Sequence, residues 1–263
     1  MGTNRAHPPR HGSGGEVPTG RQSTVEGDSP PEVAKGSPPN KDEWRGVLRV
    51  SEVFSSIQGE GLSAGLPAVF VRLQGCAVGC VWCDTKYSWK RSGGQSVPLA
   101  ALLEIVDGHH LDNVVVTGGE PLEHRGFVSL VAGLKAHGKH VEVETAGTKV
   151  PPNTPVDQWN VSLKLAHSGV AKRRRLRAAA IAAFRDLGAW FKFVVAHEGD
   201  VEEVLALQKQ YQLPSGRIML MPLGTRAEDQ YSRMPVVADW CRRYGFRFSP
   251  RLQILIWGPE RGT

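Results

Sequence analysis

Long apolar stretches are missing from this sequence of 263 residues. None of its hydrophobic runs approaches the roughly 18 residues that a membrane-spanning helix needs. The N-terminal residues also lack the apolar core and the cleavage pattern of a secretory signal peptide. These absences argue against an integral membrane protein and against a secreted one. We therefore expect a cytoplasmic protein, in a compartment where thiols stay reduced.

Cysteine is also scarce, with only four residues in the chain. A chain of this size needs no disulfide framework, and nothing marks it as secreted. Structural zinc sites usually combine one C-x2-C pair with a second cysteine or histidine pair, and no such partner lies near Cys241. We expect Cys241 to be a buried helix thiol. The other three cysteines lie close together and need a joint explanation.

Large apolar residues are almost absent from residues 1–45, which are rich in Pro, Gly, Ser and charged residues. Such a segment cannot bury enough apolar surface to offset the entropy lost on ordering. We expect residues 1–45 to form a disordered tail and residues 46–263 to form a single domain.

The chain carries a formal net charge of +6, part of which comes from one basic run at residues 172–177. A basic run that begins a helix is typically a solvated face. It also attracts anionic substrates, or an acidic electron donor such as a flavodoxin. Aromatic residues do not alternate with the basic ones and no RNA-binding module is recognisable, so the charge does not favour a nucleic-acid partner.

From Val47 onwards, strand patterns and helix patterns alternate. The expected strands are 48–54, 68–73, 113–116, 141–144, 159–163, 190–195, 217–221 and 246–249. The expected helices are 98–106, 127–134, 174–187, 201–211 and 235–244. This alternation predicts an α/β fold with a parallel sheet that is too short to close as eight units. In such sheets the functional residues gather at the carboxyl ends of the strands.

Cys76, Cys80 and Cys83 form a C-x3-C-x2-C motif directly after an apolar run. A loop of this length can bring three thiolates to one metal centre. A [4Fe–4S] cluster usually takes four thiolates, one per iron, so three leave one iron free. The motif resembles that of radical S-adenosylmethionine (radical SAM) enzymes. The resemblance implies a partial (β/α)6-type barrel as the catalytic domain, with SAM on the free iron and cleaved to a 5′-deoxyadenosyl radical.

A second motif, Thr117-Gly118-Gly119-Glu120-Pro121, directly follows an expected strand. Two glycines let the backbone approach a ligand closely, although most such pairs are simple turns. Downstream of the cysteine motif, it resembles the element that binds the SAM amino group in the superfamily. Ser162 and Lys164 are either further SAM contacts, to the carboxylate or the ribose, or an ordinary strand end.

Other segments resemble one family within this superfamily, the 7-carboxy-7-deazaguanine synthases. The resemblance covers residues 47–263 and rests on residues 56–61, 70–76, 82–85, 141–145, 191–195, 239–241 and 256–262. It implies a lyase that converts 6-carboxy-5,6,7,8-tetrahydropterin to 7-carboxy-7-deazaguanine and ammonia, in the biosynthesis of queuosine and other 7-deazapurines. The implied reaction begins with hydrogen abstraction from C6, contracts the ring and regenerates SAM, with no side chain as catalyst.

The same resemblance implies ligands for individual residues. The implied substrate contacts are Ile57, Gln58, Gly59, Glu60, Arg72, Thr117 and Thr263. The implied SAM contacts are Trp82, Cys83, Asp84, Gly119, Ser162 and Lys164. The cluster would be held by Cys76, Cys80 and Cys83, and Mg2+ by Thr85. The chain departs from the family pattern at Ala146, Leu163 and Met221. A homodimer is also implied.

These residue types suit their implied partners. The guanidinium of Arg72 pairs with a carboxylate through two parallel hydrogen bonds, and the Glu60 carboxylate suits the donor-rich edge of an aminopyrimidinone. Magnesium prefers oxygen ligands and keeps several waters, so the Thr85 hydroxyl together with substrate oxygens is a plausible set.

Two other functions stay open on the sequence. A different radical SAM enzyme, such as a glycyl-radical activase, would share the cysteine motif, but such enzymes often add ferredoxin-like cysteines that are missing here. A zinc-binding or RNA-binding protein without enzymatic activity would use the cysteines only as structural ligands. Iron and sulfide content separates this last class from the other two.

Overall fold

The computed structural model describes residues 46–263, and the disordered tail expected over residues 1–45 lies outside the described residues. The sheet has nine strands in the order β3-β1-β2-β4-β5-β6-β7-β8-β9. Strand β1 (Val47–Ile57) pairs antiparallel with β2 (Pro67–Leu73) and with β3 (Gln95–Pro98). Every later pair, from β2 through to β9, is parallel.

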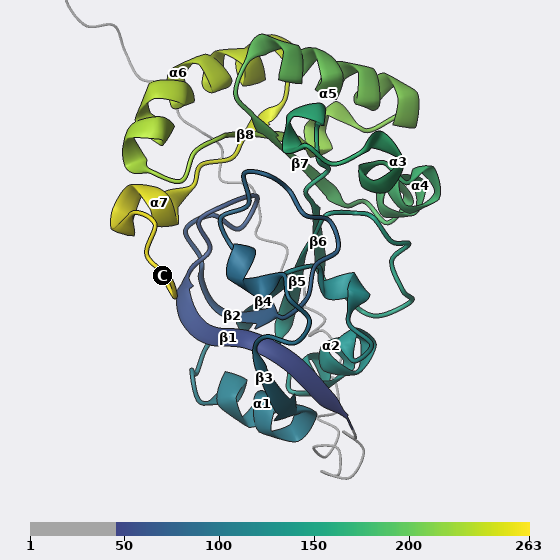
Figure 1. Ribbon diagram of the computed structural model, residues 1–263, viewed down its shortest axis with the longest axis vertical. Helices are drawn as coiled ribbons and strands as arrows, with labels where there is room; N and C mark the ends of the chain where they lie inside the picture. The colour runs from purple at the N-terminus through teal and green to yellow at the C-terminus, as the bar shows by residue number, and fades with distance from the viewer. Residues whose placement is uncertain (1–45) are drawn as a thin grey trace, which may run out of the picture. The chain divides into compact units, whose positions relative to one another are not determined.

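Helices alternate with the parallel strands along the chain, except that no helix lies between the fifth and the sixth strand. The remaining strands are β4 (Asn113–Gly118), β5 (His140–Thr145), β6 (Gln158–Val161), β7 (Trp190–Val195), β8 (Ile218–Pro222) and β9 (Arg247–Phe248). The helices are α1 (Leu99–Asp107), α2 (Phe127–Ala136), α3 (Lys172–Arg175), α4 (Ala178–Asp186), α5 (Glu198–Tyr211), α6 (Ala227–Tyr244) and α7 (Leu252–Trp257). The strands follow one another along an arc, with α2, α4, α5 and α6 on its outer side (Figure 1). Strands β1 and β9 are not neighbours, so the barrel is partial, which confirms the expected fold class.

Along each strand, side chains point alternately to the hydrophobic core and to the inside of the arc. Val114, Val116, Val141 and Val143 are fully buried in the core against the helices. The residues between them face the inside of the arc, because successive side chains of a strand point to opposite sides. The polar residues of this inner face include Arg72, Thr117, Glu142, Glu144, Asn160 and Lys192.

Several local expectations are wrong, each for a physical reason. The single helix expected over 174–187 is two helices, because Leu176 and Arg177 have extended backbone and Leu176 is buried in the core. Helix α6 begins at Ala227, so Pro235 lies inside it and does not begin it. Pro235 is exposed, so water can solvate the carbonyl whose hydrogen bond it removes. The antiparallel start of the sheet, strand β3 and helix α7 were not expected.

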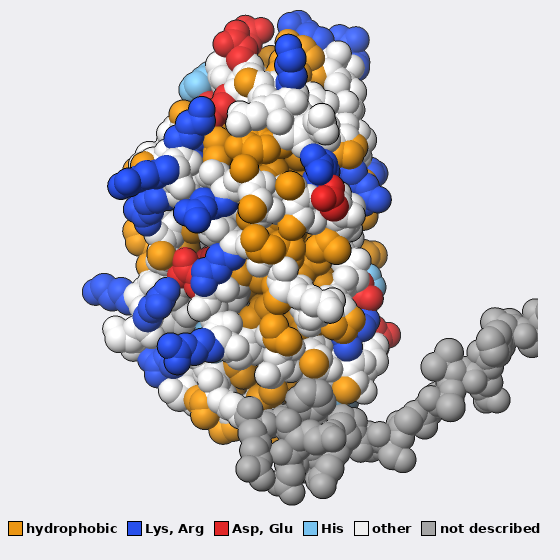
Figure 2. All heavy atoms as spheres, turned by 90° about the vertical axis from the view of Figure 1, so that its right-hand side faces the viewer, with side chains coloured by type: hydrophobic (Ala, Val, Ile, Leu, Met, Phe, Trp, Pro, Cys, Tyr) orange, Lys and Arg blue, Asp and Glu red, His pale blue; other side chains and the backbone are white. Residues whose placement is uncertain are grey.

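The molecular surface is uneven in charge. Figure 2 views the side on which α3 and α4 lie in Figure 1, and it shows Lys and Arg side chains gathered along the margin that faces the viewer of Figure 1. Hydrophobic side chains run down the middle of the same view. Among the described helices, none combines the length and the hydropathy needed to cross a bilayer.

Candidate active site

A cavity of about 260 Å³ lies inside the arc, where the parallel strands end. Its wall comes from the loop after β1, the cysteine loop after β2, the ends of β4 to β8, and residues near α7. The structure brings every residue that the resemblance implied to this one cavity. These are Ile57, Gln58, Gly59, Glu60, Arg72, Cys76, Cys80, Trp82, Cys83, Asp84, Thr85, Thr117, Gly119, Ser162, Lys164 and Thr263.

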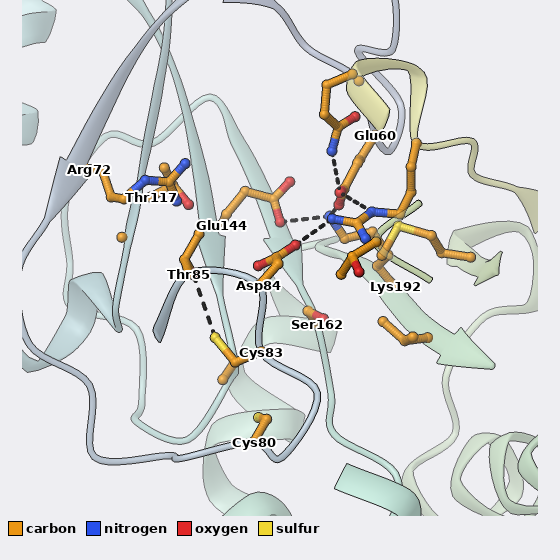
Figure 3. Close-up of a pocket in the computed structure, with 18 of the residues that line it drawn as sticks. Glu60, Arg72, Cys80, Cys83, Asp84, Thr85, Thr117, Glu144, Ser162 and Lys192 are labelled. Carbon is orange, nitrogen blue, oxygen red and sulfur yellow. Dashed lines mark hydrogen bonds and ion pairs between the residues drawn. The ribbon is translucent and has the colours of Figure 1, made fainter. Parts of the chain in front are cut away.

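The wall is divided into regions of different chemistry (Figure 3). Cys80 and Cys83 lie together at one end. Arg72 and Thr117 lie side by side on another wall, since they are register partners on β2 and β4. Glu60 and Lys192 lie across the cavity from this pair.

The cysteine loop presents alternate residues to the cavity. Between Cys76 and Trp82, the residues that line the cavity are Cys76, Val78, Cys80 and Trp82, and the exposed residues between them are Ala77, Gly79 and Val81. All three thiols are free. Among the described residues, no three His, Cys, Asp or Glu side chains are close enough to share one metal ion. In a four-iron cluster each thiolate binds its own iron, so the three thiols do not need to meet at one ion.

The surroundings of the thiols also fit a cluster. Burial raises the pKa of the Cys76 and Cys80 thiols, so a bound cation is needed to hold them as thiolates at neutral pH. The indole Nε1 of Trp89 donates to Cys83 Sγ over 3.3 Å, and Thr85 Oγ1 lies 3.5 Å from the same sulfur. Such contacts are typical of cluster sulfurs, whose potential depends on hydrogen bonds and solvent exposure.

The two glycines after β4 bring the end of that strand against the cysteine loop. A Cβ on Gly118, whose φ is +145°, would overlap the backbone of Leu73, and one on Gly119 would overlap the carbonyl of Gly75. The Gly119 N–H donates to the Leu73 carbonyl and the Glu120 N–H to the Gly75 carbonyl, both over 2.9 Å. The glycines therefore permit a backbone-to-backbone contact, in addition to the close approach to a ligand expected from the motif.

Glu120 of the same motif has a structural role. Its buried carboxylate accepts hydrogen bonds from the Thr145 hydroxyl over 2.6 Å and from the Ala146 N–H over 2.7 Å. Burial raises the pKa of Glu120 despite these bonds. The end of β4 is thereby joined to the end of β5, and Ala146 is held on the cavity wall.

We expect Gly119→Ala to destabilise the protein by about 1–3 kcal/mol or more, the usual cost of overpacking, because the new methyl group would overlap the backbone carbonyl of Gly75. Gly216→Ala is the matched control, since a Cβ there meets no atom within 4 Å. It is expected to change the free energy of unfolding by less than about 0.5 kcal/mol. Denaturant unfolding of both variants measures the difference, and equal stabilities would contradict this account of the motif.

A buried group of charges forms the wall across from Arg72. Lys192 Nζ donates to Glu60 Oε2 over 2.7 Å and to Glu144 Oε2 over 2.9 Å. Glu60 Oε1 accepts from Arg251 Nε over 3.0 Å and from Gln253 Nε2 over 2.8 Å. Both oxygens of Glu60 are thus oriented by donors from two distant parts of the chain.

The charges of this group fix one another's protonation. Burial acts to raise the pKa of Glu60, but the charges of Lys192 and Arg251 outweigh it and hold that pKa far below its usual range. Burial acts to lower the pKa of Lys192, but Glu144 and Glu60 raise it above its usual range. Arg251 also forms an ion pair with Asp84, which links the buried charges to the cysteine loop.

Arg72 is held at its wall by a second group of charges. Its Nε donates to Glu52 Oε1 over 2.6 Å, an arrangement that leaves the two terminal nitrogens of the guanidinium for a ligand. Glu52 also accepts from the Tyr87 hydroxyl over 2.8 Å and from Arg261 Nε over 2.7 Å. The Arg261 guanidinium stacks 3.9 Å from the Tyr87 ring centroid, and this contact holds the segment that carries Thr263 beside the cavity.

The region between the cysteines and the end of β6 has an unsatisfied donor. Lys164 Nζ donates to Ser162 Oγ over 2.7 Å and lies 5.3 Å from the Trp82 ring centroid. His167 stacks on the same indole, with centroids 5.6 Å apart. The buried Nε1 of Trp82 has no partner among the described residues. A buried polar atom of this kind usually has a partner, so its place beside the thiols fits a ligand with acceptor atoms, such as SAM.

The side chain of Gln58 is used inside the protein, although the residue lines the cavity. Its Nε2 donates to Glu142 Oε1 over 2.6 Å, and its Oε1 accepts from the Glu60 N–H over 3.2 Å. Asn160 Nδ2 donates to the same Glu142 oxygen over 2.6 Å. Burial and the neighbouring Glu144 raise the pKa of Glu142 to about 7. Gln58 therefore fixes the turn that orients Glu60.

The three side chains that donate hydrogen bonds to Glu60 were not expected as site residues: Lys192, Arg251 and Gln253. The sequence does contain an indication for Lys192, because a lysine in the middle of an apolar strand needs a buried partner. The other two lie in a segment without a motif, which reaches the cavity through the unexpected helix α7. Of the positions that depart from the family pattern, Ala146 and Met221 line the cavity, and Leu163 is buried in the core.

The partial barrel and the three-thiol loop define a class of protein. The family model described as the Radical SAM superfamily matches residues 70–222. The chain therefore belongs to the radical SAM superfamily, as the cysteine motif predicts.

The relatives narrow this class further. The chain is 44% identical over 229 residues to a 7-carboxy-7-deazaguanine synthase of Pyrobaculum aerophilum, an alignment covering 82% of this chain and 97% of the relative. It is 37% identical over 221 residues to that of Hyperthermus butylicus, covering 81% and 94%. The crystal structure of QueE from Escherichia coli matches with a TM-score of 0.65 and 26% identity, covering 80% of this chain and 97% of that one. The chain belongs to the 7-carboxy-7-deazaguanine synthase family of radical SAM enzymes.

Proposed function

We propose that this protein converts 6-carboxy-5,6,7,8-tetrahydropterin to 7-carboxy-7-deazaguanine and ammonia, in the biosynthesis of queuosine or another 7-deazapurine. The observation that carries the proposal is one cavity whose wall holds three free thiols, with Arg72 and Glu60 on opposing sides. The names of the similar proteins support the same activity.

The superfamily implies a [4Fe–4S] cluster and SAM, and the residues present fit both. Cys76, Cys80 and Cys83 would hold three irons and leave the fourth for SAM. The proposed SAM contacts are Trp82, with its unpartnered indole N–H, and Cys83, Asp84, Gly119, Ser162 and Lys164. When bound, the two cofactors supply the radical that abstracts hydrogen from the substrate.

The protein's own contribution is orientation of the pterin. The two terminal nitrogens of Arg72 are proposed to bind the substrate carboxylate as a fork. Glu60 is proposed to accept hydrogen bonds from the aminopyrimidinone edge. Because Lys192 and Arg251 keep Glu60 ionised, it acts only as an acceptor, which selects a donor-rich edge. The other proposed substrate contacts are Ile57, Gln58, Gly59, Thr117 and Thr263.

Exclusion of water is the second contribution. The cysteine side of the cavity is packed by a small apolar cluster of Val78, Ala146 and Val170 around Cys80. An apolar wall of this kind limits the access of solvent to a reactive centre.

Thr85 is proposed as the protein ligand of Mg2+. Its hydroxyl lines the cavity next to Cys83. Magnesium keeps several waters and takes oxygen ligands from the substrate, so one hydroxyl from the protein is enough. The family resemblance also supports a cytoplasmic homodimer and reduction by a donor such as flavodoxin, which we include in the proposal.

An anaerobic assay tests the proposed activity. Reconstituted protein would be incubated with SAM, Mg2+, dithionite and carboxytetrahydropterin, and carboxydeazaguanine is expected by mass spectrometry. Absence of this product, with the cluster intact and SAM bound, would reject the proposal. Radical formation on a protein glycine would instead indicate a glycyl-radical activase. Colourless protein that contains zinc and no iron would indicate a structural metal site.

Replacing Arg72 by lysine is expected to raise KM for the pterin about 10- to 100-fold, since a charge-assisted hydrogen bond contributes about 1.5–3 kcal/mol. A lysine keeps the charge but cannot form the two parallel bonds. Arg91→Lys is the control, because Arg91 pairs with Glu123 at the surface with its side chain 73% exposed. Steady-state kinetics at saturating SAM measure both variants, and an unchanged KM for Arg72→Lys would contradict the assignment.

A further inference from the structure

The cysteine loop has an outer face as well as the inner face that lines the cavity. Ala77, Gly79 and Val81 are exposed on the outer face, and Val81 is 60% exposed. Ala77 directly follows Cys76, and Val81 directly follows Cys80. A molecule that rests on this small apolar face therefore lies one residue from two of the three thiols.

A basic segment, residues 172–177, is anchored beside this face. The Val81 N–H donates to the Ser168 carbonyl over 3.0 Å, so the loop before the segment packs on the cysteine loop. The Arg174 guanidinium donates to the carbonyl of Ala77. These two contacts hold the basic segment at the edge of the apolar face.

The positive charge of this segment is largely unneutralised. Arg175 is buried and pairs with Glu203 over 2.8 Å. The exposed basic residues are Lys172, Arg173, Arg174 and Arg177. Residues 162–185 contain no Asp or Glu. The margin of basic side chains in Figure 2 lies on the same side of the molecule as α3.

We propose that residues 77–81 and 172–177 form the docking surface for a small acidic protein that carries one electron at a time. The inference rests on the proposed function, which needs an external electron, and it names where that electron enters. In each encounter the reduced centre of the carrier loses one electron and the oxidised cluster gains it. No proton is transferred at this surface.

The chemistry of the surface favours such a carrier over a nucleic acid. Electron-transfer encounters use small contact areas, and complementary charge steers their association. An apolar centre with basic side chains along one edge has this form. Surfaces for single-stranded nucleic acid add aromatic side chains on which bases stack, and the sequence from Ser168 to Ala183 contains no aromatic residue.

A charge-reversal triple variant tests the proposal, with Lys172→Glu, Arg173→Glu and Arg177→Glu in the holoenzyme. These side chains lie outside the cavity wall. With reduced flavodoxin as the donor, kcat/KM for the donor is expected to fall at least about 10-fold, whereas dithionite-driven activity stays within about twofold, because a small reductant needs no docking. The dissociation constant for flavodoxin at low ionic strength is expected to rise at least about 10-fold, and its salt dependence to shrink.

A second triple variant is matched in charge: Lys209→Glu, Arg242→Glu and Arg243→Glu. These residues lie in the last turns of α5 and α6. Both helices end near the amino ends of the strands, at the opposite edge of the sheet from the cysteine loop. Equal weakening of flavodoxin binding by both variants would mean that only net charge matters, and would overturn the proposal.

An unchanged dissociation constant for the variant at residues 172–177 would also overturn it. So would tight, charge-dependent binding of a single-stranded RNA oligonucleotide without any effect on flavodoxin. Absence of product from wild-type protein with dithionite would refute the proposed function instead, and the binding measurement would still decide the docking surface.

Discussion

Cys80→Ala is expected to yield protein without an iron–sulfur cluster and without measurable formation of carboxydeazaguanine. Loss of an outer partner at a metal site typically costs about 10- to 100-fold in affinity or activity, so loss of a direct ligand should cost more. The remaining thiols, Cys76 and Cys83, could not hold three corners of the cluster. Anaerobic reconstitution followed by iron and sulfide analysis and visible absorbance measures the loss.

Cys241→Ala is the matched control for this experiment. Cys241 is also a buried, free cysteine, but it lies on α6, and its thiol donates to the Arg247 carbonyl over 3.3 Å. Burial raises its pKa to about 11, so it stays a neutral thiol. This variant is expected to keep its iron and its activity. Retention of a full cluster by Cys80→Ala, or its loss from Cys241→Ala, would contradict the assignment of ligands.

Lys192→Met is expected to destabilise the protein by about 3–5 kcal/mol, the usual cost of breaking a buried ion pair from one side. Glu60 and Glu144 would be left without their shared cation. For a domain of this size the melting temperature is expected to fall by about 10 °C. Pterin binding is expected to weaken with it, because Glu60 would lose one of the two cations that keep it ionised and the donor that orients its Oε2. Thermal unfolding and ligand titration measure the two effects.

The stability lost in Lys192→Met is expected to depend on pH, and the direction of the change can be worked out. In the wild type the pKa of Glu60 is lowered, so its stabilisation is present above the ordinary pKa of a carboxyl group and is lost only in strong acid. Without Lys192, only Arg251 would still oppose the effect of burial on Glu60, so the pKa of Glu60 would rise, and acidification would relieve part of the penalty by protonating it. The stability deficit of Lys192→Met is therefore expected to shrink as the pH falls from neutral towards 4.

Lys135→Met is the control for Lys192→Met. Lys135 Nζ also bonds a carboxylate, that of Asp157 over 2.6 Å, but both side chains are 30% exposed. Exposed pairs contribute about 0–1 kcal/mol, so a small change is expected. Similar losses for the two variants would show that the buried charges have no special role.

Much of the cavity wall could be predicted because its motifs are short and each follows a strand. The cysteine motif and the Thr117-Gly118-Gly119-Glu120 motif carry their chemistry in consecutive residues. Parallel strands end at one edge of the sheet, so motifs that follow different strands meet there. The resemblance to known enzymes then gave each residue an expected ligand.

The buried charges could not be predicted in the same way. The strand period places Lys192 on the inner face of β7 but does not say which carboxylates meet it. Its partner Glu60 comes from the loop after β1, and Arg251 comes from the residue before α7. Only the curvature of the whole sheet brings these segments together. The break at Leu176 has a similar origin, since burial of that side chain overrides an alanine-rich helical pattern.

The gap between β1 and β9 leaves the barrel with a seam. Across it, the Leu252 N–H donates to the Gly59 carbonyl over 3.0 Å, the Gly61 N–H to Ser249 Oγ over 2.8 Å, and Arg251 to Glu60. The Glu60 carboxylate, which we propose binds the pterin, thus also joins the segment after β1 to the segment after β9. A ligand that adds to its contacts tightens the seam, and one that displaces Arg251 or Gln253 loosens it. Ligand binding in the pocket and closure of the barrel are thermodynamically linked. A ligand that stabilises the contacts across the seam is itself bound more tightly by the same free energy.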